Sequence, residues 1–272
     1  MRNGLSEVEV EEVKRYAKEK LGVCRKLNDI IGTQIFSILG LYARVIYYPF
    51  GEDAPWGFTR ISGSRNDSKL ERPFVSINTS IPVTCQVFAA AHELYHIWYE
   101  QKPDVLPSDL LDKESNEVNE MKANRFAAEF LVDEIILRQE IDTYKITKID
   151  IKAVLQLSDL FTIPYRAMVK RLHETGFIDK DTCDTLLAES DESIQKYRKR
   201  YALFAGEPDH RIVVDNLADL SVKAYEAGLI TFERLCYLLS ICGLHPEDLG
   251  IIQSTTNAFP SDEELASIME EE

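Results

Sequence analysis

The sequence predicts an α+β fold that is mostly helical and contains a small β-sheet. Its 272 residues, 45% of them hydrophobic, are enough to bury a core in one large domain or two modest ones. Apolar residues recur at helical spacing over most of the chain. Two short segments break this pattern. Arg44–Tyr48 (RVIYY) is rich in β-branched and aromatic residues, and Phe74–Asn78 (FVSIN) alternates apolar with polar residues, so both are predicted to be strands.

The first half of the chain places helices around these two strands. Residues 49–73 contain three Pro and three Gly, which predicts a long loop or a loose hairpin around 57–61. Pro82 suits the first turn of a helix, and Pro103 stops that helix near Lys102. Ser115, Asn116 and Asp133 are expected to cap later helices. Helices are expected at residues 5–21, 27–39, 82–102, 115–131 and 133–144.

The second half is predicted to be helical throughout. Residues 152–174 resemble a helix-turn-helix, because two helical patterns flank a short turn. The segment contains four basic and two acidic residues, a local charge of +2. A DNA-binding unit and a helical hairpin packed on the preceding core both fit this pattern, and the acidity of the chain favours the hairpin. We expect a core over residues 1–148, a helix-turn-helix-like segment over 149–190 and a C-terminal helical extension over 191–272.

The charge of the chain argues against several classes of partner. Asp and Glu number 46 against 31 Lys and Arg, a net charge of −15. Nucleic acid and anionic membranes are bound by clustered Lys and Arg, so neither is an expected partner. No apolar run reaches the ~18 residues of a membrane span, and no signal-peptide pattern is present. The five Cys form no CxxC motif, which predicts reduced thiols and a cytoplasmic location.

One motif carries recognisable chemistry, the H-E-x-x-H sequence of residues 92–96. His92 and His96 are one helical turn apart on one face, so both imidazoles can reach a single metal ion. Glu93 lies beside that face, where it can hydrogen-bond a metal-bound water whose pKa zinc lowers to about 7. The pattern indicates hydrolysis of peptide bonds. Two buried structural histidines are the alternative, but that interpretation leaves the Glu93 carboxylate without a partner.

A third metal ligand is expected on the following helix. Catalytic zinc takes three protein ligands and one open position, and the other three histidines are distant in the chain. We expect Glu120 to be this ligand, because the small residues Ala123 and Ala127 follow it and let the two helices approach closely. Asn124, one turn after Glu120, is expected to support the site by a hydrogen bond. Glu117 is expected to be a solvated surface group.

These motifs together resemble the ImmA/IrrE metallopeptidases. That family shows a strand ending in I-x-I-N, then F-x-x-A-H-E-[LI]-x-H, then E-x-x-A-N-x-F-A. This chain carries the corresponding residues at 76–78, 88–96 and 120–127. The resemblance is strong over residues 74–132 and looser over 40–73 and 133–180.

The resemblance implies a zincin-like core in which His92, His96 and Glu120 bind Zn²⁺, or Mn²⁺, and Glu93 acts as the base. Two departures stand out. Tyr95 replaces a residue that is usually small, which raises the question of restricted substrate access. The usual L-L-M-P after the second motif reads F-L-V-D at residues 130–133.

Substrate contacts are expected from the strand before the metal helix and from nearby side chains. If 74–78 is an edge strand, Ser76 and Asn78 lie where a substrate chain can pair with it, and a plain core strand is the alternative. Tyr95 and His173 are candidates by residue type for stabilising the oxyanion.

Members of the family typically cleave a helix-turn-helix repressor, which derepresses a stress, phage or toxin–antitoxin locus. The resemblance therefore implies a repressor or antitoxin as the protein substrate. Two other classes remain open: a binding protein that sequesters a repressor without cleaving it, and a DNA-binding regulator that uses residues 152–174. Residues 191–272 hold 16 acidic and 7 basic residues, so the extension is suited to a basic partner.

Overall fold

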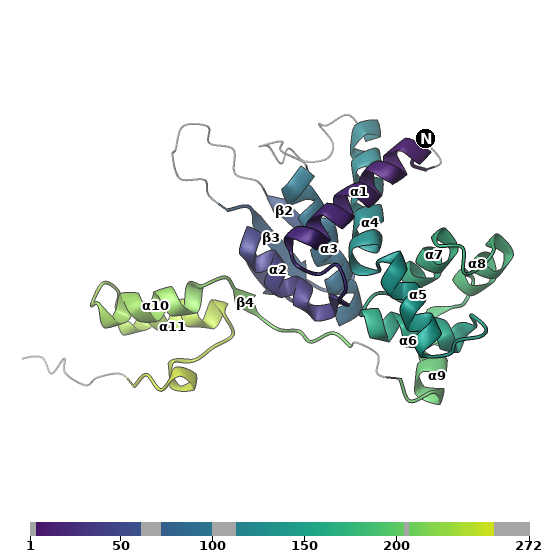
Figure 1. Ribbon diagram of the computed structural model, residues 1–272. Helices are drawn as coiled ribbons and strands as arrows, with labels where there is room; N and C mark the ends of the chain where they lie inside the picture. Colours follow the sequence, from purple (N-terminus) through teal and green to yellow (C-terminus); the bar gives the residue numbers. More distant parts are fainter. Residues whose placement is uncertain (1–3, 61–71, 100–112, 204–206, 253–272) are drawn as a thin grey trace, which may run out of the picture. The chain divides into compact units, whose positions relative to one another are not determined.

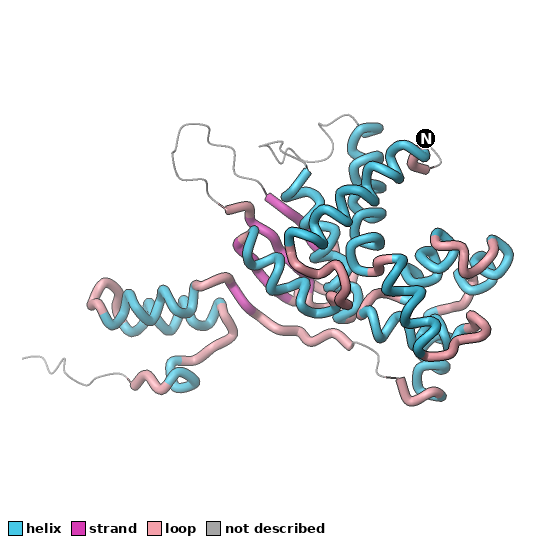
Figure 2. The backbone as a smooth tube through the Cα atoms, in the orientation of Figure 1, coloured by secondary structure: helices cyan, strands magenta, loops and turns pink. Residues whose placement is uncertain are grey.

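The computed structural model describes residues 4–60, 72–99, 113–203 and 207–252. The chain forms two compact units, residues 1–213 and 214–272. Helices dominate both units, and a small mixed sheet accompanies those of the first (Figures 1 and 2). The predicted α+β, mostly helical fold is thereby confirmed, whereas the division at residues 148 and 190 stays a prediction. Among the described residues, no helix combines the length and the apolar character needed to cross a membrane.

The sheet corrects one expectation about the strands. Its order is β2-β3-β1-β4. The interior strand β3 pairs in parallel with β1 and antiparallel with β2. The expectation that 74–78 is an edge strand is therefore wrong, and the edge beside the metal helix belongs to β2, within the loose hairpin expected around 57–61. The strands are β1 (Arg44–Tyr48), β2 (Gly57–Arg60), β3 (Phe74–Asn78) and β4 (Val213–Val214).

Two long helices pack together beside the sheet. Helix α3 (Val83–Tyr99) contacts β2 and β3 and also packs along α4 (Lys113–Leu131), which in turn packs on α1 (Glu7–Val23). Helix α3 begins right after Pro82, as expected, and its predicted end near Lys102 lies outside the described residues. In the described chain α4 already begins at Lys113, so Ser115 and Asn116 lie inside its first turn and are not caps.

The other helices of the first unit follow the sequence pattern with one shift. The helix expected from residue 27 starts later, because residues 32–34 form a 3₁₀ turn that leads into α2. The Asp133 side chain accepts hydrogen bonds from the Ile135 and Ile136 amides and caps α5, as predicted. The helices are η1 (Gly32–Gln34), α2 (Ile35–Tyr42), α5 (Glu134–Thr143), α6 (Ile151–Phe161), α7 (Tyr165–Glu174), α8 (Lys180–Leu187) and α9 (Asp191–Arg200).

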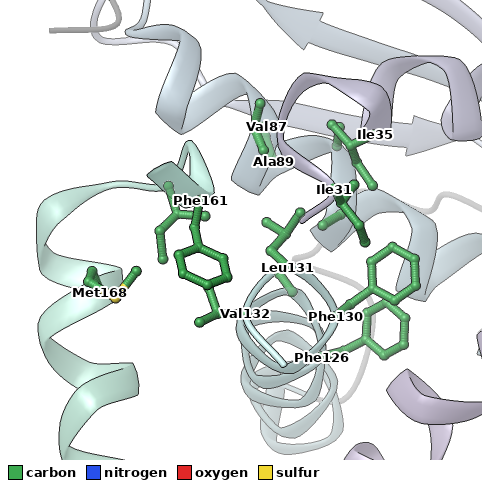
Figure 3. Packing of buried hydrophobic residues seen from close by; sticks show 14 of the residues in the cluster. Ile31, Ile35, Val87, Ala89, Phe126, Phe130, Leu131, Val132, Phe161 and Met168 are labelled. Atoms are coloured by element: carbon green, nitrogen blue, oxygen red, sulfur yellow. The ribbon is translucent and has the colours of Figure 1, made fainter. Parts of the chain in front are cut away.

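The core of the first unit is built around the C-terminal half of α4. Phe126 and Phe130 stack with ring centroids 5.3 Å apart, and both are fully buried. Figure 3 shows Ile31 and Ile35 on one side of this helix and Phe161 on another. The C-terminal half of α4 is thus enclosed by neighbouring side chains. This packing fixes the position of the whole helix, including the residues of its N-terminal half.

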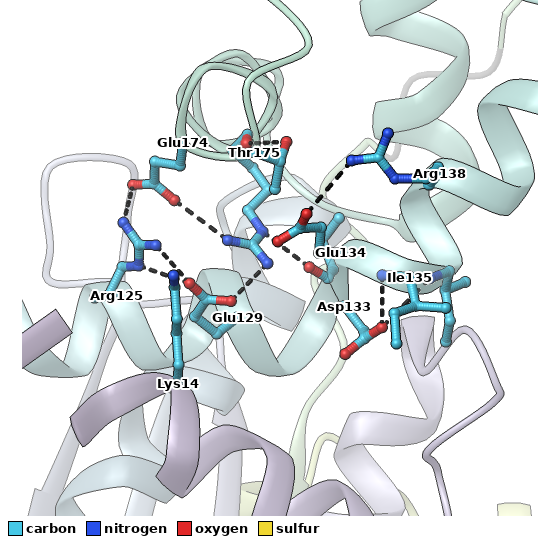
Figure 4. Close-up of polar contacts among 12 residues, drawn as sticks. Lys14, Arg125, Glu129, Asp133, Glu134, Ile135, Arg138, Glu174 and Thr175 are labelled. Carbon is cyan, nitrogen blue, oxygen red and sulfur yellow. Dashed lines mark hydrogen bonds and ion pairs between the residues drawn. The ribbon is translucent and has the colours of Figure 1, made fainter. Parts of the chain in front are cut away.

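The helix-turn-helix-like hairpin α6–α7 belongs to this core. Arg171 of α7 is only 1% exposed. Its guanidinium pairs with Glu129 of α4 at 2.5 Å, and its Nε donates to the Val132 carbonyl at 2.9 Å. Arg125 pairs with Glu129 at 2.5 Å and with Glu174 at 3.0 Å, which closes a four-membered ionic network between α4 and α7 (Figure 4). The favoured interpretation as a packed hairpin is confirmed.

The second unit consists of a short helical hairpin and a 3₁₀ turn. Among its described residues, 214–252, Leu235 and Leu239 are fully buried, while Leu229 is 77% and Tyr237 56% exposed. Its elements are α10 (Leu217–Glu226), α11 (Phe232–Ile241) and η2 (Pro246–Leu249).

We expect Arg171→Ala to lower the free energy of unfolding by about 3–5 kcal/mol, because it leaves Glu129 buried with one partner fewer. Urea denaturation of the full chain measures this. Lys196→Ala is the matched control: its ion pair with Glu192 is solvent-exposed, so its loss should cost at most about 1 kcal/mol. Equal effects of the two substitutions would contradict the assignment of Arg171 to the core.

Candidate metal centre

Helices α3 and α4 bring the three predicted ligands together. His92 Nε2 lies 2.9 Å from His96 Nε2 and 3.1 Å from Glu120 Oε2. His96 Nε2 lies 3.8 Å from Glu120 Oε1. One ligand atom from each of the three residues falls within 4.8 Å of the others. The histidine spacing is set by one helix, but the meeting with Glu120 depends on the packing of α3 along α4.

Asn124 orients the first histidine. Its Oδ1 accepts a hydrogen bond from Nδ1 of His92 at 3.1 Å. A proton held on Nδ1 leaves the Nε2 lone pair directed at Glu120 and His96, which is the tautomer that binds a metal. The hydrogen bond that was expected of Asn124 is therefore made to the ligand His92, across the interface between α3 and α4.

The two acidic side chains of the centre have opposite environments. Glu120 is about half exposed, and its hydrogen bond with His92 lowers the pKa of its carboxyl. Glu93 is only 5% exposed, and burial raises the pKa of its carboxyl, against the lowering effects of His92 and of a hydrogen bond from Thr59. The environment of Glu120 thus favours its carboxylate form, whereas burial disfavours the charged form of Glu93.

The sequence did not indicate the contact of Glu93 with β2. Thr59 Oγ1 donates to Glu93 Oε2 at 2.7 Å, and the backbone of Gly57 lies against the same carboxylate. No motif marks these two residues. Their one signal is the period of two along the strand, which places them on the same face of β2.

Tyr95 is buried and packs among aromatic rings, one of which is the imidazole of His96 at 5.9 Å. It is 4% exposed, and its ring packs 5.5 Å from Tyr99 and 5.6 Å from Phe126. The extra bulk at this position therefore fills the core between α3 and α4. A direct substrate contact by Tyr95 is not compatible with this burial.

Ser76 and Asn78 are also internal. Ser76 is 1% and Asn78 0% exposed. Asn78 Oδ1 accepts hydrogen bonds from the amides of Phe50 and Ser80, and its Nδ2 donates to the Gly51 carbonyl. Because these bonds fasten the ends of β1 and β3, Asn78 is a structural residue. The expectation that these two residues touch substrate is not compatible with their burial.

The remaining candidates are His173, on a helix that carries none of the three ligand groups, and Glu117. His173 sits in the last turn of α7, where its Nδ1 donates to the Ile178 carbonyl at 3.2 Å, so its ring closes the turn after that helix. Glu117 is exposed on α4, as expected of a surface group.

The donor set of this centre fits a divalent metal ion. Two imidazole nitrogens and one carboxylate converge, and the ligands preferred by Zn²⁺ are imidazole nitrogen and carboxylate oxygen. Three protein ligands leave a coordination position open, which is the hallmark of catalytic rather than structural sites. A second carboxylate, Glu93, is buried next to the ligand His92.

The H-E-x-x-H helix, the acidic ligand on the next helix and the small mixed sheet define the class of metallopeptidases. Residues 43–173 match the family model Peptidase_M78, described as the IrrE N-terminal-like domain. This segment, which runs from the start of the sheet through α7, belongs to the ImmA/IrrE family of metallopeptidases. The searches of curated proteins and of solved structures returned no match.

We expect the purified protein to bind about one equivalent of zinc or manganese. The variants His92→Ala and His96→Ala should each lose this metal, because the two ligands that remain do not hold a catalytic metal tightly. Metal content is measured by mass spectrometry after dialysis. His173→Ala is the matched control and should keep the full equivalent. A protein that gains no metal on addition of either ion would contradict the site.

Proposed function

We propose that this protein is a zinc-dependent endopeptidase, with His92, His96 and Glu120 as the metal ligands and Glu93 as general base and acid. The observation that carries the proposal is the convergence of these three ligand groups within 4.8 Å, beside the second, buried carboxylic acid Glu93. A metal bound there supplies Lewis-acid chemistry, lowering the pKa of a coordinated water to about 7 and polarising the scissile carbonyl. Manganese is the second metal compatible with the ligands.

Glu93 moves the proton in this mechanism. Its carboxylate takes a proton from the attacking water and delivers it to the amide nitrogen that leaves. Because burial raises the pKa of Glu93, its affinity for that proton is higher than that of a solvated glutamate, which favours the first transfer. His92 and its partner Asn124 hold the metal-facing nitrogen in place throughout.

The outer edge of β2 is where a substrate chain would be aligned. One edge of β2 pairs with β3, and the sheet order leaves the other edge without a strand in the described part of the chain. The helix-facing side of β2 touches Glu93. An extended peptide added at this edge would run beside the base, a β-augmentation that orients its scissile bond.

For the substrate, we propose a helix-turn-helix repressor or an antitoxin, whose cleavage derepresses a stress, phage or mobile-element locus in the cytoplasm. The family resemblance supports this class of substrate. The charge of the C-terminal unit supports it independently, because residues 214–272 contain 12 acidic and 2 basic residues. An acidic surface with exposed apolar side chains, among them Leu220, Leu229 and Tyr237, suits a basic DNA-binding protein.

We expect Glu93→Gln to keep the metal and the fold but to lower the cleavage rate by about 10²–10⁴-fold, since the base is lost. The inactive variant serves as bait: a partner that it retains is purified and then incubated with the wild-type chain. Cleavage of that partner by the wild type and not by Glu93→Gln is the expected result. Full relief of repression by Glu93→Gln in cells would instead favour a protein that sequesters the repressor.

The DNA-binding alternative finds little support in the basic residues of 152–174. Arg171 is buried in the ionic network, and Arg166 is used in bonds to the Leu187 and Glu189 carbonyls and to Asp191. We therefore expect no retention of the chain on duplex DNA at low salt. Retention on DNA that falls steeply as salt is added would contradict this expectation, because binding to DNA phosphates releases counterions and is therefore strongly salt-dependent.

A further inference from the structure

The carboxylate of Glu93 is held by the edge strand β2. Thr59 Oγ1 donates a hydrogen bond to Glu93 Oε2 at 2.7 Å, although the two residues are 34 positions apart in the chain. Gly57 lies two residues before Thr59 and so faces the same way. Both oxygens of Glu93 therefore have a neighbour on β2: the Thr59 hydroxyl beside Oε2 and the Gly57 backbone beside Oε1.

Residue 57 is a glycine because a side chain at this position would collide with Glu93 and Ser76. A Cβ built there would lie 3.0 Å from Glu93 Oε1, 3.3 Å from Glu93 Cγ and 3.2 Å from the backbone oxygen of Ser76. All three contacts are tighter than nine in ten real Cβ contacts, so a neighbour would have to move by a few tenths of an ångström. The Ser76 oxygen is backbone of the interior strand β3, which leaves the Glu93 side chain as the group that moves. The φ angle of Gly57 is not in the positive range, so a conformational need for glycine does not account for it. Any side chain at this position would displace the Glu93 carboxylate.

We propose that Gly57 and Thr59 form a cradle that positions the Glu93 carboxylate for proton transfer, with Thr59 holding one oxygen and Gly57 leaving room for the other. The proposal rests on the assignment of Glu93 as the base. Proton transfer requires the carboxylate within hydrogen-bond reach of the proton it accepts. A glutamate side chain that rotates about three bonds does not meet this requirement reliably unless something fixes its end.

The cradle links the base to the substrate edge. Strand β2 presents Gly57 and Thr59 to Glu93 on one face, and its backbone edge away from β3, where no strand of the described residues pairs, to the proposed substrate. The base and the edge that aligns the peptide thus share one strand of four residues. Thr59 is accordingly a positioning residue: it acts through Glu93 and does not itself touch the reacting atoms.

The kinetic test compares two substitutions of Thr59 with the same captured substrate. Thr59→Val keeps the shape of the side chain and removes the hydroxyl, so kcat should fall by about 10–100-fold while KM changes little. Thr59→Ser keeps the hydroxyl and should recover most of kcat. Both variants should retain the metal equivalent of the wild type. Unchanged kcat in Thr59→Val, or an equal loss in Thr59→Ser, would overturn the proposal.

Gly57→Ala tests the other half of the cradle. It should lower kcat at least about 10-fold by displacing the carboxylate. Gly40→Ala is the matched control, because a Cβ at Gly40 meets nothing within 4 Å and its φ is ordinary. A Gly57→Ala variant as active as the control would show that the carboxylate position is not set here.

A third measurement does not depend on peptidase activity. In the metal-free protein, Thr59→Val should lower the urea midpoint of unfolding in the wild-type background and lower it by less than half as much in a Glu93→Ala background, since the two groups interact directly. Equal shifts in both backgrounds would disprove the contact between Thr59 and Glu93. If the coupling is present but no substrate is cleaved, the cradle stands and the assignment of Glu93 as a peptidase base fails.

Discussion

The packing of α3 along α4 is the constraint on which the rest of this protein depends. Helix α4 carries the fully buried Ala123 and Ala127 on the same face as Glu120 and Asn124. Such small side chains let the helix axes approach closely enough for His92 to reach both Glu120 and Asn124 on the neighbouring helix. A larger residue at the interface would separate the histidine pair from its carboxylate, and neither helix alone would then present a complete set of metal ligands.

The ionic network at the far end of α4 extends that constraint to the rest of the first unit. Glu129 is buried between Arg125 and Arg171, so helix α7 is bound to the helix that carries the third ligand. Paired buried charges contribute little net stability compared with apolar packing, but they penalise every arrangement in which one partner is missing. The network thus selects one register of α4 against α7. This explains why a segment with a helix-turn-helix pattern serves here as part of a peptidase core.

The sheet contributes to the site through its edge. Strand β3 is interior and holds its polar residues inside, where Asn78 ties the turns around it. Strand β2 lies outside β3, and its Thr59 donates a hydrogen bond to Glu93, so this glutamate is contacted by a segment distant from its own motif. Two distant segments therefore contact the H-E-x-x-H motif: α4 meets its histidines through Glu120 and Asn124, and β2 meets Glu93 through Thr59.

Much of this protein was determined by its sequence alone: the helical character, the two main strands and the histidine pair. Those features follow from periodicity within single elements, because residues four apart on a helix share a face in any fold. Only the tertiary structure decided that β3 is interior, that Tyr95 and Ser76 are buried, and that Gly57 and Thr59 meet Glu93. Periodicity states which residues share a face, but not which element covers that face, and this depends on contacts between segments tens of residues apart.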